Sequence, residues 1–357
     1  MKRLTPSRTA ILLGGVLLAI LFFSPAVGSV PIPPLDAAGV LLHQVTGGRF
    51  PANACPDPLV VQESVDPCSV VIQIIWQGRI PEILLALLVG AALASAGGTM
   101  QGIFRNPLGD PYLLGISSGA ALGAALLFVG GVGVTDANVI LPFFAFGGAM
   151  LVAVVVLVAS QSERSTTETL LLTGVALGSL FGAVITLLLS LSPSARILPL
   201  TFWILGGFNA ASWTQVGIAF SGIAVGIALL SLHGRDLNLL QLGDETARGL
   251  GCDVRAVRRR LLLLASFVTA VAVAFSGIIA FVGLVSPHVV RRIQGPDYRN
   301  LIPLSALFGA TFMLLADDGA DSLLGGGGIL PVGVITAFIG APFFLWILYR
   351  RRAGAPA

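Results

Sequence analysis

The stretch "GIFRNPLGDPYLLG", Gly102 to Gly115, carries an arginine, an aspartate and two prolines between long runs of Ala, Leu, Val and Gly. Asn, Pro, Gly and Asp are the usual residues of a tight turn. The apolar runs on both sides are as long as a membrane-spanning helix, which needs about 20 residues. The stretch therefore predicts two membrane helices joined by a short polar turn.

The whole chain has the composition of a membrane protein. Of its 357 residues, 55% are hydrophobic and 10% are charged, whereas a soluble domain carries about 25% charged residues. Inside lipid only helices and closed barrels satisfy the backbone, and the apolar runs lack the alternating pattern of a barrel strand. We therefore expect an all-α, polytopic membrane protein.

Apolar runs predict about ten spans within a single transmembrane domain, residues 1–357. The eighth is too short to cross unaided and the ninth ends in acids, so hydropathy alone gives eight to ten. A first helix precedes an extracytoplasmic loop at 30–79, and the core helices lie within 80–349. The predicted spans are 9–29, 80–103, 112–134, 138–160, 168–191, 214–232, 260–281, 284–293, 300–320 and 330–349.

The first apolar run has two interpretations. Lys2, Arg3 and Arg8 before it also fit the start of a signal peptide. The length of the run favours a retained first helix.

Basic residues predict the orientation, because Lys and Arg gather in cytoplasmic loops. With ten spans and a cytoplasmic N-terminus, all but Arg49, Arg79 and Arg196 of the 20 basic residues lie on the inner side. Both termini and the turn at Gly102–Gly115 then face the cytoplasm, and the protein is a multi-pass protein of the cell (inner) membrane. The excess of arginine is a topology signal, so no nucleic-acid partner is expected.

The three cysteines divide between the two sides. Cys55 and Cys68 share the outer loop, where an oxidising compartment would let them form a disulfide. Two free thiols remain the alternative. Cys252 lies on the cytoplasmic side and is expected to be a free thiol.

Nothing in the sequence indicates an enzyme. His43, His233 and His288 stand in separate segments without metal-ligand spacing, and the single lysine, Lys2, rules out a P-loop. We expect no metal or cofactor on this chain, so any ATP and Mg must bind to a separate ATPase chain. An ion-coupled secondary transporter or channel stays an alternative, although such carriers usually keep ionisable groups in mid-membrane. Asp317 is the best candidate for one here.

Two of the predicted spans have similar sequences. The segment "RIPEILLALLVGAALASAGG" from Arg79 is similar to "RRLLLLASFVTAVAVAFSGI" from Arg259, with a Ser/Gly cluster at the end of each. The predicted topology runs one inward and the other outward. This is the arrangement of inverted repeats, here spans 2–5 and 7–10.

Several motifs in order resemble the FecCD-type permeases, the membrane subunits of importers for iron-siderophores, haem and cobalamin. The resemblance runs from Arg79 to Arg352 and includes "RNPLGDPYLLGISSGAALGA", "LLLTGVALGSLFGAVITLLLS", "FVGLVSPHVVRR" and "LPVGVITAFIGAPFFLWILYRR". It implies a ten-helix subunit that forms a homodimer around a central pathway. Two ATPase subunits would lie beneath it, and a substrate-binding protein would deliver a metal chelate from above. Ferric siderophore is the first expectation for that chelate, with cobalamin and haem open.

The resemblance also implies roles for individual residues. The cytoplasmic gate would contain Asn106, Leu108, Thr166 and Thr167. A short helix dipping into the outer mouth would bring four residues to the pathway: Phe202, Trp203, Phe208 and Asn209. The cytoplasmic segment 233–259 would dock on the ATPase with two short helices broken near Gly243. Its coupling residues would be Leu239, Leu242, Gly243, Asp244, Glu245, Ala247, Arg248, Leu250 and Gly251, with Asp244, Glu245 and Arg248 solvated.

The outer surface departs from the family pattern. Family permeases often present arginines to acids of the binding protein, whereas this chain keeps Arg79 but has Glu82 and Asp321 where further arginines are common. Complementary charge steers encounter between partners. The sequence therefore predicts a binding protein with basic residues opposite Glu82 and Asp321 and an acid opposite Arg79. The alternative is that Glu82 and Asp321 only face water, where ion pairs contribute about 0–1 kcal/mol.

Overall fold

The computed structural model describes residues 5–28, 30, 32–46, 67–131, 134–160, 167–323 and 330–352. Within these ranges the regular elements are helical, as predicted. Seven of the described helical segments are long and apolar enough to cross a membrane. One helix occupies each predicted span: α1 (Pro6–Phe23), α4 (Ile80–Phe104), α5 (Ile116–Val129), α6 (Val134–Ser160), α7 (Thr167–Ser190), α9 (Trp213–Leu232), α12 (Val254–Ser276), α13 (Val282–Gln294), α14 (Tyr298–Leu323) and α15 (Val332–Arg352).

Further elements fill the connections. The predicted outer loop contains α2 (Pro34–Val45), and α3 (Pro67–Ile72) runs through the π-helical segment η3 (Gln73–Arg79) directly into α4. A short 3-10 segment, η1 (Ser24–Ala26), follows α1, and another, η4 (Pro111–Leu114), precedes α5. Three short helices complete the chain: α8 (Ser194–Leu205), α10 (Gly234–Gln241) and α11 (Asp244–Gly249).

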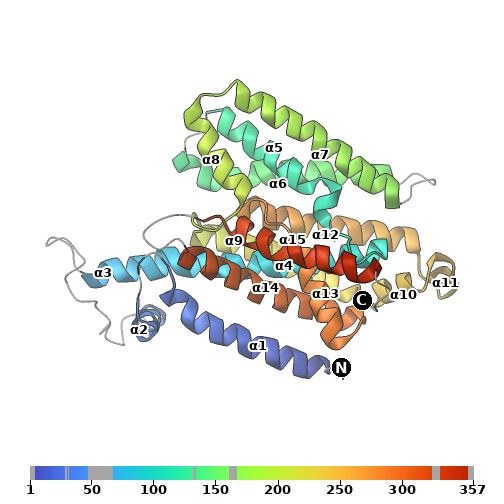
Figure 1. Cartoon of the computed structure of the whole chain (residues 1–357), viewed down its shortest axis with the longest axis horizontal. Helices are drawn as coiled ribbons and strands as arrows, with labels where there is room; N and C mark the ends of the chain where they lie inside the picture. Colours follow the sequence, from blue (N-terminus) through green and yellow to red (C-terminus); the bar gives the residue numbers. More distant parts are fainter. Residues whose placement is uncertain are drawn as a thin grey trace.

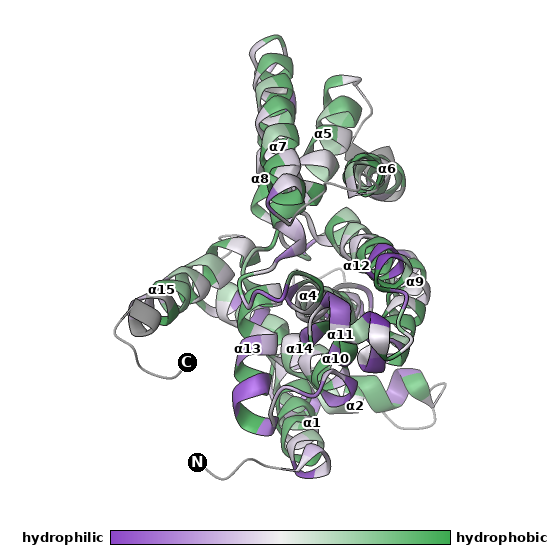
Figure 2. Cartoon of the chain, turned by 90° about the vertical axis from the view of Figure 1, so that its right-hand side faces the viewer, coloured by the Kyte–Doolittle hydropathy of each residue, from purple (hydrophilic) through white to green (hydrophobic). Residues whose placement is uncertain are grey.

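The helices form two groups (Figures 1 and 2). In one group α4 is central and packs against α9, α12, α13 and α14, while α1 lies along α14. In the other, α5 packs against α6, α7 and α8, and α6 joins the groups through α12. Figure 2 shows α15 set apart from both groups. The predicted repeat relates α4 to α12, α5 to α13 and α6 to α14. The contact between α4 and α14 therefore corresponds to the contact between α12 and α6, and the contact between α5 and α6 corresponds to that between α13 and α14.

Small residues let these helices approach closely, as membrane helix interfaces require. A Cβ atom added to Gly97 of α4 would lie 2.0 Å from the carbonyl oxygen of Gly283 on α13. One added to Gly90 would lie 2.3 Å from the carbonyl oxygen of Gly309 on α14. The central helix is therefore fixed by backbone contacts that admit no side chain.

Several span boundaries differ from the prediction, and the end of α12 has a clear physical cause. The apolar run at 260–281 reads as a continuous helix, but α12 ends at Ser276 because Gly277 turns out of the helix with φ 68°. The carbonyl oxygen of Trp203 lies where a side chain at Gly277 would begin, 2.0 Å from an added Cβ. Residues 277–280 thus form a non-helical break between α12 and α13.

Candidate functional site

A cavity of about 250 Å³ lies where α8, the segment after it and the end of α12 meet. The four residues predicted to line the pathway, Phe202, Trp203, Phe208 and Asn209, all line this cavity. Its other lining residues include Phe275, Ser276 and Gln215, and none of the described residues lining it is charged. The cavity can therefore hold an apolar or weakly polar group without an ion pair.

The sequence shapes this cavity through the end of α8. That helix stops at Leu205, and Gly206 leaves it with φ 74°. The amide of Gly207 then donates to the carbonyl oxygen of Ser276 at 2.9 Å. Phe208 is only 1% exposed and anchors the segment. The predicted short helix before α9 is therefore present, and it is tied to the break between α12 and α13.

The turn between α4 and α5, which we call the inner turn (Arg105–Asp110), is held by its own side chains. The amide of Leu108 donates to Asn106 Oδ1 at 3.0 Å, and the amide of Tyr112 donates to Asp110 Oδ1 at 2.8 Å. Asn106 and Leu108 are half-buried. The observed role of Asn106 is to close the turn, and its predicted role in a gate stays a prediction.

The 3-10 segment η4, which follows the inner turn, lies against α7. A Cβ added to Gly174 of α7 would lie 2.3 Å from the carbonyl oxygen of Leu113 in η4. Thr166 lies outside the described residues, and Thr167 is the first residue of α7, with no side-chain placement described. The contact joins α7 to the segment after the inner turn, and the predicted gate stays a prediction.

Asp110 has no basic partner among its described contacts. Burial raises the pKa of its carboxyl group from 3.8 to about 6, against the opposing effect of the hydrogen bond from the Tyr112 amide. Because the native state holds the proton more tightly, this group favours folding below pH ~4, and that contribution is lost as the pH rises through about 6.

We expect Asp110→Asn to remove this pH dependence. The asparagine keeps an oxygen that can accept from the Tyr112 amide but carries no charge. Above pH ~6 the variant should unfold with a free energy about 3 kcal/mol higher than the wild type, following about 1.4 kcal/mol per pKa unit, and the difference should vanish near pH ~4. Thermal unfolding of both proteins in detergent between these pH values measures it. Parallel pH profiles would contradict the prediction.

The predicted coupling segment forms α10 and α11, with the break at Gly243 as expected. Leu242 and Leu250 are 56% and 60% exposed, and Glu245, Arg248 and Gly251 are also exposed. Leu239 is half-buried and packs against the core. The segment therefore presents two leucines to its surroundings.

Two predictions about this segment need correction. Ala247 is 0% exposed and belongs to the hydrophobic core, because α11 turns this face toward the bundle. Asp244 is not simply solvated, because it forms ion pairs with Arg105 at 2.6 Å and with Arg258 at 3.2 Å. Ala247 cannot touch a partner in this conformation, and Asp244 binds within the chain.

Cys252 lies between α11 and α12. It is a buried free thiol, as predicted, and burial raises the pKa of that thiol. Cys55 lies outside the described residues, and no side-chain placement is described for Cys68. Their disulfide stays a prediction.

At the opposite end of the molecule, the residues predicted to dock the binding protein are more buried than expected. Arg79 is only 8% exposed, and it donates to the carbonyl oxygens of Pro25, at 2.7 Å, and Val30. Glu82 keeps one carboxylate oxygen buried without a hydrogen-bond partner in the described structure. Arg79 therefore fastens the chain after α1 instead of facing outward, whereas Glu82 and Asp321 are both half-buried.

Sequence reasoning missed a polar network beside the inner turn. Arg291 donates to Gln101 Oε1 at 3.0 Å, and Gln101 Nε2 donates to the carbonyl oxygen of Gly283 at 3.3 Å. A glutamine near the inner end of a largely apolar span was the available signal, because polar groups are costly there.

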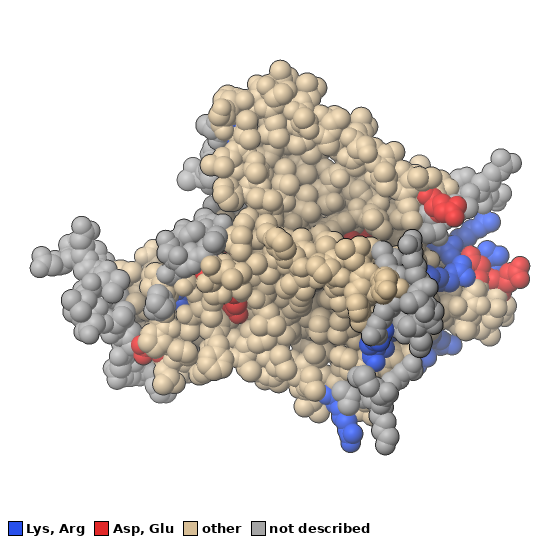
Figure 3. Space-filling view, in the orientation of Figure 1, with Lys and Arg blue, Asp and Glu red and all other residues tan. Residues whose placement is uncertain are grey.

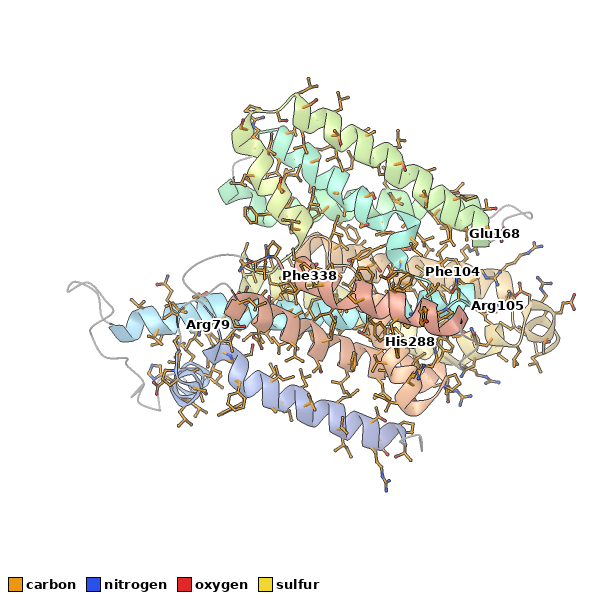
Figure 4. All side chains as sticks on the ribbon, viewed as in Figure 1. Arg79, Phe104, Arg105, Glu168, His288 and Phe338 are labelled. Atoms are coloured by element: carbon orange, nitrogen blue, oxygen red, sulfur yellow. The ribbon has the colours of Figure 1, made fainter. Side chains whose placement is uncertain are left out.

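The basic side chains are distributed unevenly between the two ends of the molecule. Figure 3 shows most basic side chains of this face toward the end of the molecule that carries α10 and α11, which we call the basic end. Figure 4 shows Arg105 at this end and Arg79 at the other. The cavity lies between elements of both helix groups, and the inner turn and coupling segment lie together at the basic end.

Comparison with known proteins identifies the family of this chain. The model of the FecCD transport family matches residues 16–350. The chain belongs to the FecCD transport family. A cobalamin import system permease of Halobacterium salinarum is 40% identical over 96% of both chains. A hemin transport system permease of Yersinia pestis is 41% identical over 78% of this chain and 84% of its own.

A solved structure shares the fold. An inward-facing metal-chelate type ABC transporter matches with a TM-score of 0.79 and 30% identity, over 96% of this chain and 99% of its own. This FecCD protein is therefore a membrane permease subunit of an ABC importer and not an enzyme.

Proposed function

We propose that two copies of this chain form the pathway by which an ATP-driven importer moves a metal chelate into the cell. Two ATPase subunits bind at the basic end, and a substrate-binding protein delivers the chelate at the other end. The basic end then faces the cytoplasm, in agreement with the positive-inside rule. The uncharged cavity lined by the four aromatic and amide residues carries this proposal.

The second part of the proposal concerns which metal chelate is transported. A large ligand that must leave again favours a weakly binding, uncharged wall over a charged site, and the cavity has such a wall. The two named relatives import cobalamin and hemin. We therefore rank the metal tetrapyrroles first and ferric siderophores, the expectation from the sequence, second.

An ion-coupled carrier is the second candidate, because one observation favours it. Asp317 is 4% exposed on a membrane-spanning helix, and buried ionisable groups in such helices often serve ion coupling. Asp317 is absent from the cavity lining, which favours the ATP-driven function.

Reconstitution separates the two candidates. The permease is purified from its host through an affinity tag together with the ATPase that accompanies it, and is placed in liposomes with the binding protein outside. Cobalamin, hemin and one ferric siderophore are offered in turn. We expect uptake of one chelate only with ATP in the lumen. Uptake driven by a proton or sodium gradient without ATPase would overturn the proposal.

A further inference from the structure

Arg105 is the last residue before the polar part of the inner turn, and its backbone conformation is unusual. It ends α4 with φ 50° and ψ 32°, in the left-handed region. Helices commonly end with glycine in this conformation, since a side chain there costs roughly 1–2 kcal/mol. An arginine at this position indicates that its side chain is needed.

The side chain reaches the coupling segment. Arg105 Nη2 lies 2.6 Å from Asp244 Oδ1, and Asp244 is the first residue of α11, 139 positions along the chain. Arg258 at the start of α12 holds the same carboxylate at 3.2 Å. One carboxylate therefore joins the inner turn, the coupling segment and α12.

A second contact holds α10 to the same end of α4. Gln241 Nε2 donates to the carbonyl oxygen of Gly102 at 2.9 Å. A Cβ added to Gly102 would lie 2.6 Å from Leu237 of α10. Both short helices are thus fastened within the last turn of α4, directly before Asn106 and Leu108.

Stability does not account for the ion pair. Both side chains are partly exposed, at 39% for Arg105 and 29% for Asp244, and exposed pairs contribute about 0–1 kcal/mol. This gain does not exceed the cost of the left-handed conformation. The pair instead fixes the register between the segment that the proposed function puts against the ATPase and the inner turn, where the sequence predicts the gate.

We propose that Arg105 is a positioning residue that transmits movement of the ATPase-facing segment α10–α11 to the inner turn through its ion pair with Asp244. The inference rests on the proposed function as an ATP-driven importer. When α11 moves with the ATPase, the carboxylate moves the end of α4, and the half-buried Asn106 and Leu108 move with it. Arg258 holds the carboxylate from the side of α12 and lies outside the inner turn.

The test measures the ATP hydrolysed per chelate transported, with the transporting complex in liposomes and the chelate that the wild type accepts. Arg105→Gln should raise this ratio at least about fivefold, within the usual range for coupling between sites. ATPase binding should be unchanged. Arg258→Gln, which removes the other partner of the same carboxylate, should keep a ratio near the wild type.

Arg105→Gly separates positioning from folding. Glycine relieves the left-handed conformation, so the melting temperature should stay equal or rise while the ratio still increases. Asp244→Asn should match Arg105→Gln, and the double variant should be no worse than either single variant, because both remove one link.

Three results would overturn the inference: an unchanged ratio in Arg105→Gln, an equal rise in Arg258→Gln, or additive effects in the double variant. A wild-type complex that fails to accumulate chelate with ATP would contradict the proposed function instead.

Discussion

Gly148→Ala is expected to destroy the packing between α5 and α6, whereas Gly147→Ala is expected to be tolerated. A Cβ added to Gly148 would lie 2.1 Å from the carbonyl oxygen of Gly119 on α5, and the neighbouring atoms are backbone that cannot rotate away. The two helices would have to separate. Overpacking of this kind costs typically 1–3 kcal/mol and occasionally more, and here the whole interface shifts.

The neighbouring glycine provides a matched control. Gly147 is exposed on the same helix and has no atom within 4 Å of an added Cβ, so Gly147→Ala makes the same chemical change without the clash. Membrane level and melting temperature in detergent measure both variants. Equal melting temperatures would show that the close approach of α5 and α6 is not required.

Leu250→Glu is expected to detach the ATPase while the permease stays folded. The leucine is 60% exposed at the basic end, where the proposed function puts the ATPase. An unpaired charge buried in an interface costs several kcal/mol, and a loss of even about 2 kcal/mol corresponds to about thirtyfold weaker binding. The fraction of ATPase that co-purifies with the tagged permease measures the effect.

Leu250→Met supplies the control, because it keeps an apolar side chain of similar volume and should retain the ATPase. Ala247→Glu is unsuitable for this test, since Ala247 is buried and the charge would disturb the fold of α11. Full co-purification of the ATPase with Leu250→Glu would remove this face of the coupling segment from the contact.

The sequence by itself determined the positions and lengths of most of the helices. The lengths of the apolar runs predicted α4, α7 and α14 closely, and the glycine at 243 predicted the break between α10 and α11. The distribution of arginine predicted one basic end, and the order of motifs predicted the family. These properties depend on neighbours in sequence, because helix length and turn formation are decided within a few residues.

The tertiary structure alone decided what the polar and small side chains do. Arg79 turns inward to carbonyl groups that follow α1, and Ala247 faces the core. Gly277 ends a run that hydropathy reads as continuous, because the end of α8 occupies the space of a side chain. Asp244 binds Arg105 across 139 positions. Each outcome depends on which helices pack together and on how each helix is rotated about its axis. The spacing of residues within one segment does not determine either of these.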